Sequence, residues 1–532
     1  MSIQPVWQQT LDFFGTPIVV EPSAGLLTSD AGLLPFRQFD EQLGLTRAFA
    51  AVLNDPRDPD LIEHTVLEMV CSRVYGILAG YADQNDHDTL RTDPLFKLLA
   101  GRSPAAPSLA SQPTLSRFEN VIDIPSLFRL RDLFIDQFIA SFPMPPKHLT
   151  LDLDAVDDPA HGDQQLTFWH GYYDQNQYLP LFITCPDNDQ FVMLSLRPGN
   201  VHAALGADDD LEYLVQRLRQ VWPDVVIVVR ADSAFGIPRM YDVCERLRLI
   251  YTFGLSANAV LQRQSEPLLD QAIAAYVQEQ RLARQEERMA QPPRLFEGFW
   301  YRAGTWDRQR YVVAKAEAND KGTNRRFVVT NRPGAALFAE GTYDEYAERG
   351  DSENRNKEIK CGLEMDRLSD HRFCANFFRL YLHVLAMNLL VRLRHQIAEP
   401  WPVVSPAAGE GTLAEEATAE AAEAAPAEAP IAGAEEGAPA EAPALTAGDL
   451  VPAGAQTGAE RQRLFRQRRQ RDPLGEGHPC TWRLLVIKVA AEVVVSARRV
   501  LVRLSSSWPH LAWYRRVCER LNGQRIAAGA LG

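Results

Sequence analysis

The stretch between residues 148 and 255 constrains the fold most, because strand-like and helix-like segments follow one another in it in a defined order. In its first segment, leucines alternate with Thr150, Asp152 and Asp154, which is typical of a β-strand that carries both aspartates on one face. Further strands are predicted at 178–185, 190–197, 225–230 and 250–255, with helices at 211–222 and 240–248. This order predicts a ribonuclease H-like α/β fold.

Two aspartates stand where predicted strands end. Asp154 lies at the end of the first strand, and Asp232 follows the apolar run 225–230, which has the composition of a buried parallel strand. If these two strands are neighbours, both carboxylates lie at the sheet edge where sites form in open α/β sheets. Asp152 shares the face of Asp154, about 7 Å further down the strand, and is a second candidate. For each aspartate alone, capping of a loop is the alternative role.

A second set of polar side chains lies later in the chain. These are, at positions i, i+3, i+7 and i+14, Tyr346, Arg349, Glu353 and Lys360. On a continuous helix these four side chains stay within about 60° of one another. One helical face then carries an aromatic hydroxyl, a carboxylate and two cations, which suits a metal ion bound next to a phosphate. The alternative is an ordinary solvated helix with charge pairs.

The segment 346–360 resembles the Tyr-Arg-Glu-Lys signature of DDE transposases from bacterial insertion sequences. The longer text Glu353-Asn-Arg-Asn-Lys-Glu-Ile-Lys-Cys-Gly-Leu, with Arg379-Leu-Tyr-Leu-His downstream, is similar to DDE-domain group 1 and within it to insertion-sequence family thirteen-eighty. The resemblance spans most of the chain except residues 401–460. It implies Mg²⁺-dependent DNA cleavage and strand transfer at the inverted-repeat ends of the insertion sequence itself.

The resemblance implies a catalytic role for Asp154, Asp232 and Glu353. The resemblance favours Asp154 over Asp152 as the catalytic residue, because in this family the active aspartate lies at the end of its strand. Carboxylates from different elements supply the hard oxygen ligands that two Mg²⁺ or Mn²⁺ ions require. We therefore expect these three residues to be both the catalytic residues and the metal ligands.

The resemblance also implies that Tyr346, Arg349 and Lys360 contact phosphates and a distorted base at the transposon end. Arginine suits a bidentate phosphate contact, and lysine suits a point-charge contact. A half-buried aromatic side chain is the alternative role for Tyr346. The partners implied are double-stranded DNA, as transposon ends and as target, and a second copy of the chain in a homodimer.

An aromatic run, Trp169-His-Gly-Tyr-Tyr173, follows the first predicted strand. Its rings can stack on nucleobases or pack within a hairpin, and hairpin packing is the interpretation that we favour. Two histidines in this region, His161 and His170, have no partner at metal-ligand spacing, so we do not count them as ligands.

Residues 1–145 form a predicted helical N-terminal region. Within it, Gln112-Pro-Thr indicates the start of a short helix that carries Ser116 and Arg117, as in a helix-turn-helix contact to DNA. A plain helical bundle is the alternative, and it agrees better with the acidic charge balance of this region. The resemblance favours binding of DNA ends here.

The remaining domain boundaries follow shifts in composition. Residues 146–257 and 343–398 form the two parts of the predicted core, and 258–342 is a predicted β-rich insertion between them. Residues 401–460 contain eleven Asp or Glu and no Lys or Arg, and this Ala/Glu/Pro text predicts a disordered linker. Residues 461–532 carry fifteen Lys or Arg against four Asp or Glu, so a basic C-terminal region is expected, with a Val-rich hairpin at 482–504.

Composition limits the class of protein. Hydrophobic residues make up 46% of the 532 residues, as in soluble globular proteins. The seven cysteines form no C-x-x-C pair, which argues against a zinc ribbon and fits a reducing compartment. No signal-like or membrane-spanning apolar run occurs, so we expect a cytoplasmic, nucleoid-associated protein. The rival functions are a ribonuclease H-like nuclease or resolvase without strand transfer, and a domesticated DNA-binding protein that keeps the fold. Loss of one carboxylate would favour the domesticated protein, and none is lost here.

Overall fold

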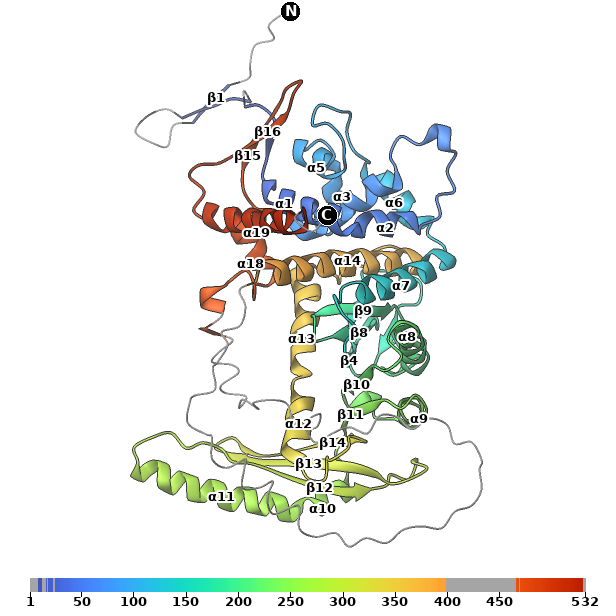
Figure 1. The fold of residues 1–532 in the computed structure, drawn as a ribbon, viewed down its shortest axis with the longest axis vertical. Coiled ribbons are helices and arrows are strands. Elements are labelled where there is room, and N and C mark those ends of the chain that lie inside the picture. Colours follow the sequence, from blue (N-terminus) through green and yellow to red (C-terminus); the bar gives the residue numbers. More distant parts are fainter. Residues whose placement is uncertain are drawn as a thin grey trace, which may run out of the picture.

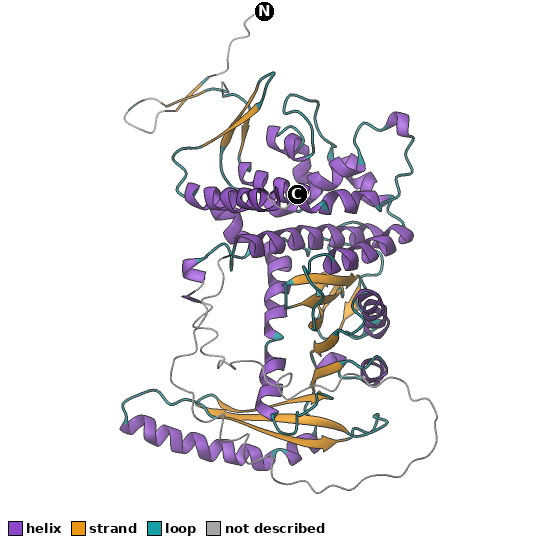
Figure 2. Ribbon diagram, in the orientation of Figure 1, coloured by secondary structure: helices purple, strands orange, loops and turns teal. Residues whose placement is uncertain are grey.

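The computed structural model describes residues 24–398 and 469–529, with the short stretches 8–11, 16, 18–22 and 466–467. The predicted linker at 401–460 lies outside the described residues. In the described part, helices gather at one end of the molecule and a large sheet extends from them to the other end (Figures 1 and 2).

An eight-stranded mixed sheet with the order β12-β13-β14-β11-β10-β4-β8-β9 forms the centre of the fold. β4 (His148–Ala155), β10 (Val226–Ala231) and β11 (Ile250–Leu255) run parallel to one another. β8 (Leu181–Cys185) pairs with β4, and β9 (Gln190–Ser195) pairs with β8, both antiparallel. The predicted strand order is confirmed, and the mixed sheet is consistent with a ribonuclease H-like core.

The alternation of leucines with polar residues in β4 explains how the sheet packs against the helices on one of its faces. Leu149, Leu151 and Leu153 are fully buried, in a cluster that includes the apolar face of α8 (Ala207–Val221). α9 (Pro238–Arg246) contributes to the same cluster and connects β10 to β11. Because side chains alternate along a strand, Asp152 and Asp154 lie on the opposite face of β4 from these leucines.

The β-rich segment 258–342 does not form a sheet of its own. After α10 (Ala259–Gln264) and α11 (Glu266–Gln285), it forms β12 (Arg294–Tyr301), β13 (Arg310–Asn319) and β14 (Gly322–Thr330). β14 pairs antiparallel with β11, so the three strands extend the core sheet, and α11 packs along them (Figure 1).

The segment 346–360, which contains the Tyr-Arg-Glu-Lys residues, is not one continuous helix, so that prediction is wrong. α12 (Ala339–Ala347) ends before Arg349, α13 (Gly350–Lys357) begins directly after it, and a π-helical turn, η5 (Glu358–Gly362), follows. Glycine is a poor helix former, which agrees with a break directly before Gly350. The segment rises from β12–β14 to α14 as a column beside the sheet (Figure 1).

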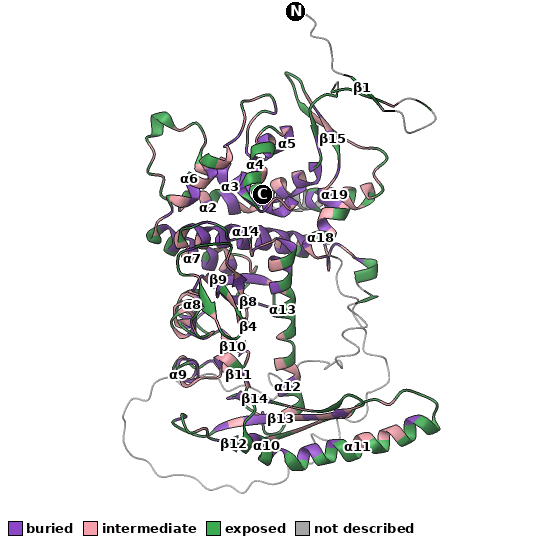
Figure 3. Cartoon of the chain, turned by 180° about the vertical axis from the view of Figure 1, so that it is seen from behind, coloured by how far each residue is buried: buried purple, intermediate pink, exposed green. Residues whose placement is uncertain are grey.

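The N-terminal region is helical, as predicted. Its principal helices are α1 (Leu34–Leu43), α2 (Leu45–Ala51), α3 (Val66–Ala79), α5 (Pro94–Leu99), α6 (Gln112–Asn120) and α7 (Ile124–Ile139). They pack around α14 (Phe373–Ile397), which is buried along most of its length (Figure 3). Among the described helices, α14 alone is long and apolar enough to cross a membrane, but 89% of its apolar window is buried inside the protein, as in a core helix.

The chain after the linker returns to the N-terminal helices. The predicted hairpin at 482–504 is wrong in its first half, where α18 (Pro479–Trp482) and the π-helical turn η7 (Arg483–Ile487) replace a strand. Its second half is confirmed, since β15 (Ala491–Val495) and β16 (Val500–Leu504) form a hairpin that joins β3 (Leu27–Thr28). α19 (Leu511–Gly529) completes this part.

Candidate active site

The two strand-end aspartates lie at one edge of the sheet. Asp154 stands one residue before the end of β4, and Asp232 directly follows β10. β4 and β10 are parallel neighbours, with Leu153 opposite Ala231. The Asp232 carboxylate also accepts a hydrogen bond from the Ala234 backbone at 2.9 Å, which caps the short helix η4 (Ser233–Phe235). The topology therefore places both carboxylates where the sequence predicted them to lie.

Arg349 connects this edge to α13. Its Nη2 donates to Glu353 Oε1 at 3.0 Å, and its Nη1 lies 3.8 Å from Asp154 Oδ2. Burial lowers the pKa of the Arg349 guanidinium, but Tyr346 and the carboxylates Asp154, Glu353 and Asp232 together raise it above its usual value. The interruption between α12 and α13 thus places one arginine among three carboxylates.

The carboxyl group of Asp154 is largely buried at this edge of the sheet. Burial raises its pKa to about 7, and the charges of Asp232 and Glu353 add to this effect, while Arg349 opposes it. Asn356 Nδ2 donates to Asp154 Oδ2 at 2.7 Å, which orients the carboxylate, and Asn356 Oδ1 is buried without a partner. One arginine does not neutralise the negative charge gathered here.

The residues present fit a divalent metal ion by type and by charge. Asp154, Asp232 and Glu353 offer hard oxygen ligands from three elements, and burial together with the two neighbouring carboxylates raises the pKa of Asp154. In residues 24–398 and 469–529, no three His, Cys, Asp or Glu side chains already stand close enough to hold one ion.

Asp152 is engaged in a different interaction. Its two carboxylate oxygens accept hydrogen bonds from Arg230 Nε at 2.7 Å and Nη2 at 2.8 Å, and both side chains are almost fully buried. Arg230 also donates to the backbone oxygen of Glu345 at 2.7 Å, which ties α12 to the sheet. The structure therefore gives Asp152 a bidentate structural partner that Asp154 lacks.

Tyr346 lies close to the edge of the sheet. Burial raises the pKa of its hydroxyl, with a smaller contribution in the same direction from Asp232, and its ring lies 6.0 Å from the Arg349 guanidinium carbon. A Cβ atom at Gly254 would lie 2.7 Å from the Tyr346 hydroxyl, so glycine at this position of β11 permits the close approach. Tyr346 is partly buried, which agrees with both roles considered for it.

Lys360 lies in η5 and contacts a different part of the chain. Its Nζ donates to the backbone oxygen of Asp157 at 2.8 Å and to Asp157 Oδ1 at 2.9 Å. Arg349 instead contacts Asp154 and Glu353. The common helical face predicted for the four residues is interrupted, although Asp157 follows Asp154 by only three residues.

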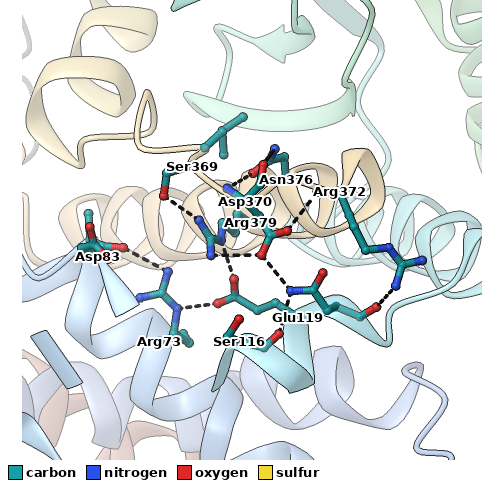
Figure 4. Close-up of polar contacts among 12 residues, drawn as sticks. Arg73, Asp83, Ser116, Glu119, Ser369, Asp370, Arg372, Asn376 and Arg379 are labelled. Atoms are coloured by element: carbon teal, nitrogen blue, oxygen red, sulfur yellow. Dashed lines mark hydrogen bonds and ion pairs between the residues drawn. The ribbon is translucent and has the colours of Figure 1, made fainter. Parts of the chain in front are cut away.

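The helix predicted to contact DNA is fixed within the N-terminal bundle. Glu119 of α6 is fully buried, and it accepts hydrogen bonds from Arg73 Nε at 2.9 Å and from Arg379 Nε (Figure 4). Ser116 lines a polar cavity of about 420 Å³, together with residues 369–371. Arg117 is exposed.

Three residues near the site were missed by the sequence analysis. Arg230 and Asn356 act through partners that lie 78 and 202 residues away, so no local pattern identifies them. Gly254 carried a usable signal, because a glycine inside a strand marks the close approach of another group.

Comparison with known proteins identifies the family. No curated protein matches the chain. A family model described as transposase DDE domain group 1 matches residues 12–402, which is nearly three quarters of the 532 residues. Members of this family are phosphoryl-transfer enzymes that act in DNA transposition and generally use divalent metal ions. The chain therefore belongs to the transposase DDE domain group 1 family.

Proposed function

We propose that this protein cleaves DNA and transfers the cut strand at the inverted-repeat ends of its own insertion sequence, as a member of insertion-sequence family thirteen-eighty. The observation that carries this proposal is the position of Arg349, which contacts both Asp154 and Glu353 beside Asp232. A carboxylate cluster that surrounds a single cation, at the end of parallel strands, suits phosphoryl transfer on DNA.

In this proposal Asp154, Asp232 and Glu353 are the catalytic residues and hold two Mg²⁺ or Mn²⁺ ions. Ions bound there activate the attacking oxygen and stabilise the leaving oxygen. Asp154 releases its proton on loading, because its raised pKa leaves part of it protonated near neutral pH. Asn356 keeps one oxygen of Asp154 in a defined orientation through its hydrogen bond.

The DNA contacts proposed for Tyr346, Arg349 and Lys360 use cations that are now paired with carboxylates. Arg349 binds Glu353, and Lys360 binds Asp157. A DNA phosphate offers the same acceptor geometry with a full negative charge, so it can replace these partners. We further propose a homodimer that joins two ends and a target duplex, and a cytoplasmic, nucleoid-associated location.

The experiment that tests the proposal follows both reaction products. Purified protein is incubated with Mg²⁺ and a duplex made from the inverted repeat that flanks the gene, together with a plasmid target. The expected result is a cut at the end of the repeat and joining of that end to the plasmid. Cutting without joining would contradict transposition and would identify a nuclease or resolvase. Binding without cutting would identify a DNA-binding protein.

A further inference from the structure

The hairpin of β6 (Phe168–His170) and β7 (Gln175–Tyr178) exposes aromatic rings near the carboxylate cluster. Trp169 is 56% exposed and Tyr172, at the turn, is 85% exposed. Phe168 is also exposed, and its side chain lies on the other face of β6 from Trp169. In the described residues, these rings belong to none of the hydrophobic clusters. The hairpin packing that the sequence favoured is present in part, because the Tyr173 ring lies 5.0 Å from the rings of His170 and Tyr172, but it leaves Trp169 and most of Tyr172 exposed.

The base of this hairpin is anchored firmly. Tyr178 of β7 is fully buried and donates from its hydroxyl to the Gln165 backbone oxygen at 2.7 Å. The Gln165 backbone N–H donates in turn to the backbone oxygen of His371 at 2.9 Å. A Cβ at Gly199 would overlap the Gln177 backbone oxygen, so the chain there lies directly against β7. The hairpin that carries the exposed rings is therefore firmly attached to the rest of the protein.

A chain of hydrogen bonds connects the hairpin to the proposed DNA contact at Lys360. Gln175 Nε2 of β7 donates to Asp157 Oδ2 at 3.1 Å, and Lys360 Nζ donates to Oδ1 of the same carboxylate. The hydroxyl of Tyr173 is close enough to the cluster that Asp157, Asp154 and Asp232 add to the effect of burial in raising its pKa. Lys360 therefore lies beside the hairpin.

We propose that the hairpin 168–178 is a base-binding surface, on which Trp169 and Tyr172 stack with unpaired bases of the DNA strand next to the cleavage site. This inference rests on the proposed function, since it takes Lys360 as a phosphate contact. Inside a duplex both faces of each base are covered by its neighbours, so a protein ring stacks only on a base that has left the helix. Stacking of this kind tolerates any sequence, because every base offers a flat aromatic face.

The test compares three DNA probes of one sequence, namely a paired duplex, the duplex with a short single-stranded 3′ tail, and the same tail without its bases. We expect Trp169→Ala and Tyr172→Ala each to weaken binding of the tailed duplex about 10-fold, with little effect on the paired duplex. The salt dependence stays unchanged, because no phosphate contact is removed. Trp169→Phe retains most of the affinity.

Two controls make the result specific. Phe128→Ala removes an aromatic ring of similar exposure, 55%, on α7, and is expected to bind all three probes like the wild type. Removal of the bases from the tail is expected to lower wild-type affinity at least as far as Trp169→Ala lowers it on the tail with bases. Equal losses on the paired and tailed duplexes, or no loss on either, would overturn the inference. If the wild type cuts its DNA ends but the hairpin variants bind like it, only the base-binding surface is refuted. If the wild type neither binds nor cuts them, the proposed function fails.

Discussion

Asp152 and Asp154 lie on one face of β4, but their replacement by asparagine is predicted to change the stability of the metal-free protein differently. Asp152→Asn removes one partner of a buried bidentate pair and leaves the Arg230 guanidinium buried without its counter-charge. Breaking such a pair costs about 3–5 kcal/mol of folding free energy. Arg230 keeps its hydrogen bond to the Glu345 backbone and lies 3.6 Å from Glu348, so we expect a value near 3 kcal/mol, at the lower end.

Asp154→Asn is expected to leave the metal-free protein as stable as the wild type or to stabilise it. Because burial raises the pKa of Asp154 from 3.8 to about 7, its charged form is unfavourable in the folded state. Below about pH 4 Asp154 is mostly protonated in both the folded and the unfolded chain, so its replacement by asparagine has little effect on stability there. The wild type loses stability as the pH rises from about 4 to about 7, by up to about 4 kcal/mol, and the variant avoids this loss.

Urea midpoints measured in chelator at pH 8, together with cleavage of end DNA, distinguish the two residues. The expected result is a lowered midpoint for Asp152→Asn, and an unchanged or raised midpoint with no cleavage for Asp154→Asn. Asp152→Leu combined with Arg230→Met replaces the pair by apolar groups and should recover most of the lost stability. A stable but inactive Asp152→Asn, beside an active Asp154→Asn, would show that the two assignments are reversed.

Three further predictions follow from buried or paired groups. Burial lowers the pKa of His383 to about 3, so as the pH falls from about 6.5 this residue takes up a proton in the unfolded chain but not in the folded chain. The folded state therefore loses stability toward about pH 3. His383→Leu should reduce this loss, measured as urea midpoints against pH. Arg349→Ala and Lys360→Ala should each lower the slope of log affinity for end DNA against log salt by about one; unchanged slopes would contradict phosphate contacts. Trp482→Ala should cost about 3–5 kcal/mol, because the ring is fully buried against Phe36, whereas Trp300→Ala, 63% exposed, should cost little.

The sequence predicted the parts of the fold that local patterns determine. Alternation of leucines with polar residues over 148–154 indicated a strand and its buried face, and the following segments indicated the order of the core. The strand-end positions of Asp154 and Asp232 followed from that order. These features depend on side chains near one another in the chain, so periodicity reveals them.

The parts that were missed depend on distant contacts. The π-helical turn η5 contains Glu358, whose buried carboxylate accepts from Arg394 Nη1 at 2.9 Å, 36 residues further along the chain. The apolar segment 482–487 is helical because Trp482, Val486 and Ile487 are buried against the N-terminal helices, and this packing outweighs their strand preference. Likewise, nothing local indicated that β14 pairs with β11.

The measurement that tests the central claim most directly is the single-turnover rate of end cleavage in Mg²⁺ for Asp154→Asn, Asp232→Asn and Glu353→Gln. Asp351→Asn is the matched control, because it neutralises an exposed carboxylate on the same helix as Glu353. We predict that each of the three variants binds end DNA but cleaves it about 1,000-fold more slowly, a loss of about 4 kcal/mol, while the control cleaves normally. Cleavage within about tenfold of wild type by any of the three would remove that residue from the catalytic site.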